Sequence, residues 1–318
     1  MTVIQRPATL CFAADMADYI IDSDSTITFA IQLNGSLILS EQYSPDGANQ
    51  IRIRKLGRLC RLALWGRFSI GAQDNAMGSF TFLINDAVDS VSTVIFSNAH
   101  SKFNAGACWL SSVRNKVTRS SSIEYLSCYI PSGSQVTIKK TTAAGEIESV
   151  LYTNSSTDVI MTLDVSLAVV GVCSRYSLTI GTDVFTFHVD DTQYIDVFTF
   201  RYRNNFEMPE TLSIVGGLKL KGNDESAIAD MYGISRKFEV KCTDEYTANS
   251  GVIYMQSDYK LWHDLFMSQE VEILSDGAWY KIVVSKQNYE RTFRRSILKA
   301  VEFSFKMADL DDNGIIEI

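Results

Sequence analysis

Short stretches in which apolar and polar residues alternate recur along most of this 318-residue chain. The first clear stretch, 25–33, has apolar residues at every second position, which is the period of a strand with one buried face. An Asn34-Gly35 pair follows it, and this pair between two apolar runs is a strong signal for a β-hairpin. The pattern therefore predicts a mainly β fold.

Further strand-like runs fill the first two thirds of the chain, with Gly, Asn, Asp and Ser between them. They cover 78–85, 90–97, 123–130, 135–141, 146–152, 159–172 and 175–180. Short strands at this spacing are typical of a β-sandwich or barrel. One amphipathic helix is predicted within 51–65, where Arg54, Arg58 and Arg61 lie off the apolar stripe. We interpret these arginines as a solvated face rather than as an anion site.

The sequence favours two parts. The five residues Asp-Val-Phe-Thr-Phe occur at 183–187 and again at 196–200, which predicts two neighbouring strands around a turn. We place the boundary there, with a β-sandwich-like region over 1–192 and a split β-barrel-like domain over 193–318. The first region can be divided into two lobes near 100–122, its least regular stretch.

The second part alternates again and contains one helix. Strands are expected at 236–242, 252–256, 271–273, 279–285 and 296–306. Between them, the spacing of Leu261, Trp262, Leu265 and Phe266 predicts a short helix near 258–268 with one face packed on the sheet.

Composition excludes several classes of function. Lys and Arg total 29 and Asp and Glu total 37, so the net charge of −8 argues against nucleic acid as a partner. No run reaches the ~18–20 apolar residues of a membrane span. We also see no signal peptide. The six cysteines include no close pair, so we expect reduced, buried thiols and no structural zinc.

No catalytic signature is recognisable. The three histidines, His100, His188 and His263, lie far apart, and no nucleophile elbow, Walker loop or Rossmann fingerprint is present. We therefore expect neither an enzyme nor a cofactor.

One stretch resembles a metal-binding loop. Asp309, Asp311 and Asn313 match the first half of a calcium loop, but the position of its bidentate Glu would fall beyond Ile318. A polar turn before a terminal strand at 315–318 is the better interpretation, and no metal site is expected.

Residues 198–309 carry a family-like signal. They include FTFRYRNNFEMPET (198–211), KFEVKC (237–242), YKLWHDLFMSQEVEIL (259–274), GAWYKIVVSK (277–286) and AVEFSFKMAD (300–309). This region resembles the C-terminal part of structural proteins in prophages of gut Bacteroides-type bacteria. Its layout is also similar to the tail-tube-like domain of phage distal tail and baseplate hub proteins.

The resemblance implies a non-enzymatic component of a phage tail tip, baseplate or related injection apparatus. It implies a ring-forming homo-oligomer that assembles by edge-to-edge strand contact with itself and with other tail or baseplate proteins. Such a protein would assemble in the bacterial cytoplasm and end in the tail particle, without binding a membrane. The interface candidates are Arg201, Arg203, Arg291, Arg294 and Arg295.

Two other classes stay open. A carbohydrate-binding or adhesion β-sandwich would use exposed aromatic residues, with Trp109, Tyr125, Trp279 and Tyr280 as candidates. A β-rich enzyme is the third and weakest alternative.

Overall fold

The structure, a computed structural model, describes residues 1–98, 108–255, 257–288, 300–309 and 315–316, with the side chains of 223–225, 239–242 and 287–288 left out. It is mainly β, with 54% of residues in strands and 9% helical, and one of its sheets curls into half a barrel. The predicted fold class, a β-sandwich or barrel protein, is confirmed. None of the described helices is long and apolar enough to cross a membrane.

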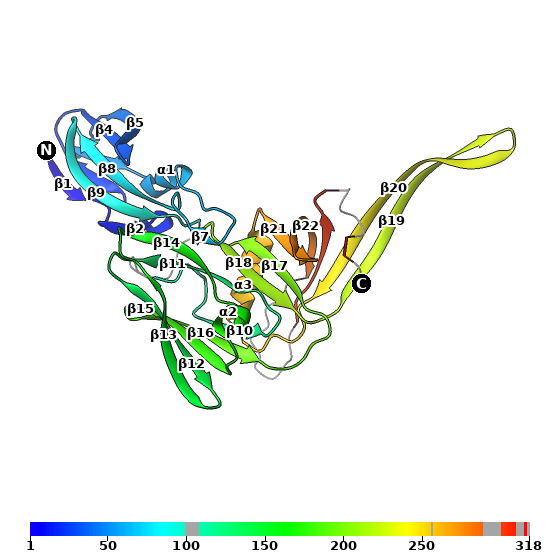
Figure 1. Cartoon of the computed structure of the whole chain (residues 1–318). Helices are drawn as coiled ribbons and strands as arrows, with labels where there is room; N and C mark the ends of the chain where they lie inside the picture. The colour runs from blue at the N-terminus through cyan, green and yellow to red at the C-terminus, as the bar shows by residue number, and fades with distance from the viewer. Residues whose placement is uncertain (99–107, 256, 289–299, 310–314, 317–318) are drawn as a thin grey trace.

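Two sheets form the N-terminal end of the molecule (Figure 1). The first has the order β2-β9-β8-β4-β5 and the second the order β1-β3-β6. Their bounds are β1 Thr2–Gln5, β2 Leu10–Phe12, β3 Tyr19–Asp22, β4 Ile27–Leu33, β5 Ser36–Tyr43, β6 Gln50–Ile53, β8 Met77–Ile84 and β9 Ala87–Ile95. Asn34 and Gly35 both have positive φ, as the predicted hairpin turn requires. The short helices η1 (Ala13–Asp15) and α1 (Leu56–Leu62) pack together beside these sheets.

Two further sheets follow in the chain. One has the order β10-β16-β15-β12-β13 and the other the order β11-β14-β7. Their bounds are β7 Gly71–Ala72, β10 Asn115–Arg119, β11 Tyr125–Ile130, β12 Gln135–Thr142, β13 Gly145–Thr153, β14 Val159–Asp164, β15 Arg175–Ile180 and β16 Asp183–Asp190. Helix α2 (Leu167–Val170) connects β14 to β15.

The last third forms a sheet with the order β18-β17-β21-β22-β23-β20-β19. Its bounds are β17 Phe198–Arg203, β18 Pro209–Ile214, β19 Leu218–Met231, β20 Ile234–Asn249, β21 Val271–Ser275, β22 Ala278–Asn288 and β23 Glu302–Met307. Helix α3 (Asp258–Met267) covers one face, as predicted, with Leu261 and Leu265 fully buried and the ring of Trp262 5.8 Å from that of Phe303.

The buried residues do not divide where the chain was expected to divide. A core cluster around Tyr19, Phe29 and Phe82 belongs to residues 11–96 alone. The other large cluster runs from Cys108 to Ile316 and so joins the second pair of sheets to the C-terminal sheet. The C-terminal sheet itself takes all its strands from residues after 197. The domain boundary at 192 stays a prediction.

Some local predictions were wrong. The two Asp-Val-Phe-Thr-Phe segments are not neighbouring strands, because β16 already has β10 and β15 on its two sides and the second copy enters β17 of another sheet. The predicted strand 159–172 ends at Asp164, and Leu167–Val170 is helical because Leu167 and Val170 share the buried side while Val169 faces solvent.

Other corrections concern element limits. The first part of the predicted helix 51–65 is strand β6, and residues 251–255 are not a strand. The two described residues of the predicted terminal strand, 315 and 316, are irregular.

The thiol prediction is confirmed for five cysteines, which are free and buried: Cys11, Cys60, Cys108, Cys128 and Cys173. The side chain of Cys242 lies outside the described set.

Candidate interaction site

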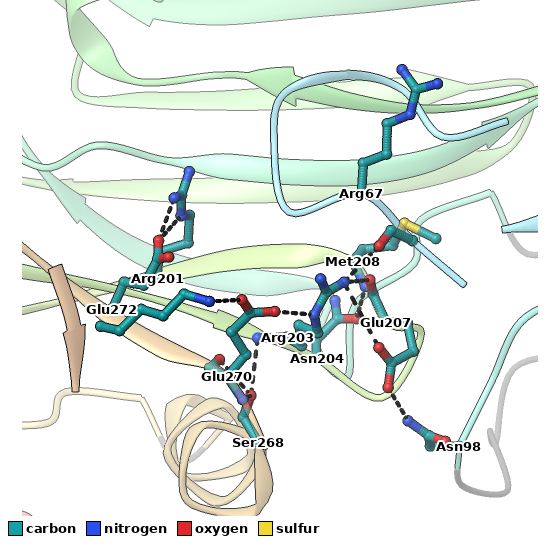
Figure 2. Close-up of polar contacts among 12 residues, drawn as sticks. Arg67, Asn98, Arg201, Arg203, Asn204, Glu207, Met208, Ser268, Glu270 and Glu272 are labelled. Atoms are coloured by element: carbon teal, nitrogen blue, oxygen red, sulfur yellow. Dashed lines mark hydrogen bonds and ion pairs between the residues drawn. The ribbon is translucent and has the colours of Figure 1, made fainter. Parts of the chain in front are cut away.

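Strand β17 presents two arginines on one face and two aromatic residues on the other. Phe200 and Tyr202 are fully buried in the core. Arg201 and Arg203 point the opposite way, towards the first part of the chain, and Figure 2 shows both held by carboxylates. The alternation of a strand therefore places both sequence-selected arginines together on one surface.

Arg201 is fixed on three sides. Its guanidinium pairs with Glu272, the residue opposite it on β21. The central carbon (Cζ) of its guanidinium also lies 4.5 Å from the ring centroids of both Phe68 and Trp279. This distance favours a cation–π contact with each ring. Because Phe68 belongs to the first part of the chain, Arg201 joins that part to the C-terminal sheet.

Arg203 makes a second connection of the same kind. Its Nε donates to Glu270 at 2.6 Å, and its Nη1 donates to the backbone oxygen of Gly66 at 2.6 Å and of Glu207 at 3.2 Å. Lys281 Nζ approaches the other oxygen of Glu270 at 3.1 Å. Burial alone would raise the pKa of Glu270, but the hydrogen bonds from Arg203 and Lys281 outweigh it and lower that pKa.

A cleft of about 980 Å³ lies beside Arg203 and is lined by both parts of the chain. We call it the Arg203 cleft. Its polar lining includes Arg61, Asn98, Arg203, Glu207, His263, Asp264, Glu270 and Lys281. Its lining also includes three exposed apolar side chains, Leu62, Met267 and Val283, whose exposed fractions are 77%, 66% and 57%. Exposed apolar side chains gathered in a hollow are a feature of surfaces that bind other molecules.

The wall of the cleft nearest α3 contains a buried carboxylate. Asp264 accepts hydrogen bonds from Ser112 and, at 3.0 Å, from Asn205. Burial raises the pKa of Asp264, although Ser112, His263 and Asn205 oppose that rise. His263 itself is mostly exposed and lies 3.8 Å from Asp264.

The two outer strands of the C-terminal sheet differ in accessibility. β18 is covered by the first part of the chain: β11 packs beside it, Lys116 donates to the carbonyl of Thr211, and the Tyr125 amide donates to the Thr211 hydroxyl at 3.1 Å. Among the strands that the structure describes, β19 pairs with β20 alone, and its other edge has no described strand beside it. An open strand edge carries unpaired backbone groups that can pair with another chain.

Strands β19 and β20 form a long hairpin that projects from the body, which we call the arm (Figure 1). At about 3.3 Å per residue, the 14 residues of β19 span roughly 45 Å. The base is buried through Leu218, Tyr246 and Ala248. Every residue of 226–238, the arm tip, is exposed except Ala227. A two-stranded hairpin without a core is marginally stable alone, so a surface that covers it would stabilise it.

The structure describes only one of the remaining interface and metal candidates from the sequence, Asp309. Arg291, Arg294, Arg295, Asp311 and Asn313 fall outside the described residues. Asp309 is exposed, and within the described part of the chain no three His, Cys, Asp or Glu side chains group as a metal site. For Arg201 and Arg203 the structure gives partners within the chain, and a role in contact with another protein stays a prediction.

The aromatic candidates for glycan binding do not form an exposed platform. Trp109 is fully buried, with its ring 6.1 Å from that of Phe185. Tyr125 and Trp279 are half-buried and lie 6.3 Å apart, and Trp279 is already stacked on Arg201. Tyr280 is half-buried against the core.

Sequence reasoning missed the partners of the two arginines. Glu270 and Glu272 are two residues apart, as Arg201 and Arg203 are, and this matched spacing was the available signal. Gly66 and Phe68 gave no signal, because they lie more than 130 residues earlier in the chain.

Comparison with known proteins assigns this chain to no family. No protein-family model matches the chain, and no curated protein shows a significant sequence match to it.

Proposed function

We propose that this protein is a non-enzymatic structural component that assembles with further copies of itself through the arm. The observation that carries the proposal is the exposed arm tip, where Ile228, Met231, Tyr232, Ile234 and Phe238 face solvent. Monomeric proteins rarely expose so many large apolar residues together, and such patches mark interaction surfaces.

The layout of the last third supports a more specific setting, a phage tail tip, baseplate or related injection apparatus. The C-terminal sheet combines a helix packed on one face, a β21–β22 hairpin and the closing strand β23. This is the arrangement on which the resemblance to tail-tube-like domains rests. Other tail proteins would then be further partners.

The covered edge at β18 changes how such an assembly would be built. A ring in which sheets join edge to edge needs two open edges in each copy, but β18 is closed by β11 and Lys116. Assembly through the arm needs one projecting element and one receiving surface. We therefore favour the arm over simple continuation of the sheet.

Sedimentation velocity of the whole chain over a wide concentration range tests the proposal. We expect a species larger than a monomer that dissociates on dilution. A strict monomer at every concentration, with binding on a glycan array, would instead favour the carbohydrate-binding alternative.

A further inference from the structure

Three walls of the Arg203 cleft each present one basic side chain and one exposed apolar side chain. The pairs are Arg61 and Leu62 on helix α1, His263 and Met267 on helix α3, and Lys281 and Val283 on strand β22. The first pair comes from the first part of the chain and the other two come from the C-terminal sheet and its helix. Distant segments therefore bring the same combination of groups to one hollow.

The accessible charged groups of the cleft are basic. The side chains of Lys281 and His263 are 65% and 59% exposed. Those of Glu207, Glu270 and Asp264 are only 28%, 25% and 5% exposed. A molecule that enters the cleft therefore meets its basic groups before its carboxylates.

The carboxylates of the cleft also have partners within the chain. Glu207 accepts a hydrogen bond from the Asn98 side chain at 2.8 Å (Figure 2). Glu270 is held by Arg203 at 2.6 Å and by Lys281 at 3.1 Å. A cationic ligand would have to displace these bonds, so the cleft is poorly suited to positive charge.

Arg61 differs from the two other arginines of its segment. The sequence predicted a solvated face for Arg54, Arg58 and Arg61, and the first two are exposed. Arg61 is instead half-buried and lines the cleft. Its Nη1 donates to the backbone oxygen of Asn98 at 3.1 Å, and it forms no ion pair with a carboxylate that the structure describes. Because a guanidinium has five N–H donors, most of them stay available to a ligand.

The chemistry of the walls defines the class of ligand. Carboxylates suit the basic groups, since arginine binds a carboxylate through two parallel hydrogen bonds. Apolar side chains would be buried against Leu62, Met267 and Val283. A single small carboxylate would engage one wall, whereas a ligand that contacts all three needs several acidic and several apolar groups in one molecule. A short peptide segment of acidic and apolar residues has this composition.

We propose that the Arg203 cleft binds an acidic, apolar peptide segment of a partner protein. The segment would attach that partner where the first part of the chain meets the C-terminal sheet. No described residue of the arm lines the cleft, so this contact is additional to assembly through the arm.

A synthetic peptide tests the proposal with the full-length protein. The probe is fluorescein-labelled Asp-Leu-Gly-Glu-Leu-Glu, and its binding is followed by fluorescence anisotropy. We expect saturable binding with a dissociation constant of about 100 μM or lower. Replacing its acidic residues by Asn and Gln, or its leucines by Ser, should weaken binding at least tenfold. Equal binding of the three peptides, or no binding of the probe, would overturn the inference.

Two arginine variants locate the binding. Arg61→Gln keeps an amide that can donate to the Asn98 carbonyl, and it should weaken binding of the probe about tenfold because a charged donor is lost. Arg58→Gln, at an exposed position on the same helix that does not line the cleft, is the matched control and should bind as the parent does. Melting temperatures check that both variants are folded. Equal affinities of the two variants would contradict a site in the cleft.

Sedimentation velocity with and without the probe separates this inference from the proposed function. The probe should leave the association of the parent chain unchanged. Dissociation of a multimer by the probe would mean that the cleft already holds a second copy, and it would overturn the partner protein as the occupant. A probe that fails to bind leaves assembly through the arm intact, whereas a strictly monomeric chain that binds the probe overturns that assembly alone.

Discussion

Arg203 donates a 2.6 Å hydrogen bond from Nη1 to the backbone oxygen of Gly66, a residue 137 positions earlier in the chain. The approach is close enough that a Cβ added to Gly66 would lie 2.2 Å from the backbone oxygen of Glu207. Only glycine allows the 66–68 segment to lie this close to the turn between β17 and β18. The two residues thus join the first part of the molecule to its C-terminal sheet.

Replacing Arg203 should loosen this junction. Arg203→Ala leaves the carbonyl of Gly66 without this donor and Glu270 with Lys281 alone, and we expect a loss of about 2 kcal/mol in the free energy of unfolding. Urea denaturation measures the change. Arg67→Ala removes an exposed ion pair with Asp74 and should cost less than about 0.5 kcal/mol. Equal effects of the two variants would contradict the structural role of Arg203.

The aromatic cluster under α3 should dominate the stability of the C-terminal sheet. Phe303 is buried, and its ring centroid lies 5.4 Å from Phe200 and 5.5 Å from Phe266. Phe303→Ala should lower the free energy of unfolding by about 3–5 kcal/mol, because it leaves a cavity in a packed core. Phe238→Ala, on the exposed arm tip, should leave the unfolding transition of the monomer unchanged. Thermal and urea denaturation at low protein concentration compare the two.

Stability should fall as pH rises from about 4 to about 7. Burial raises the pKa of Glu210 to about 7, against the opposing effect of Lys116, and burial likewise raises the pKa of Asp258 to about 7. Below pH 4 these groups are protonated in both folded and unfolded chains. Between pH 4 and 7 the unfolded chain releases their protons first, which favours unfolding, and above pH 7 the loss is complete.

Melting temperatures at pH 5 and pH 8 test this dependence. The parent chain should melt at the higher temperature at pH 5, and Glu210→Gln should reduce the difference because the titrating group is gone. Glu146→Gln, at an exposed ion pair with Lys139, is the control and should keep the difference of the parent. The prediction is wrong if the parent chain is more stable at pH 8 than at pH 5.

The sequence predicted the parts of the fold that depend on local pattern. Alternation located strands such as β4, β8 and β12, and the spacing of Leu261, Trp262 and Leu265 located α3. Which strands pair is a matter of long-range packing, so the second Asp-Val-Phe-Thr-Phe segment was placed beside the first although β16 has no free side.

The exposure of the arm and the contacts of the two arginines likewise could not be predicted from local sequence. Ile228 and Met231 are residue types that usually lie in a core, and nothing local reveals that no described sheet covers them. Arg201 and Arg203 were selected from the sequence, but their contacts with Phe68 and Gly66 depend on how distant segments meet.

Shortening the arm tests the central claim most directly. Replacing 222–244 by Asn-Gly keeps Lys221 paired with Glu245 through a two-residue hairpin turn and removes every residue of the arm tip. We predict that this variant is a folded monomer by sedimentation velocity, with the melting temperature of the dissociated parent chain, while the parent itself assembles. A shortened chain that assembles as the parent does would contradict the account.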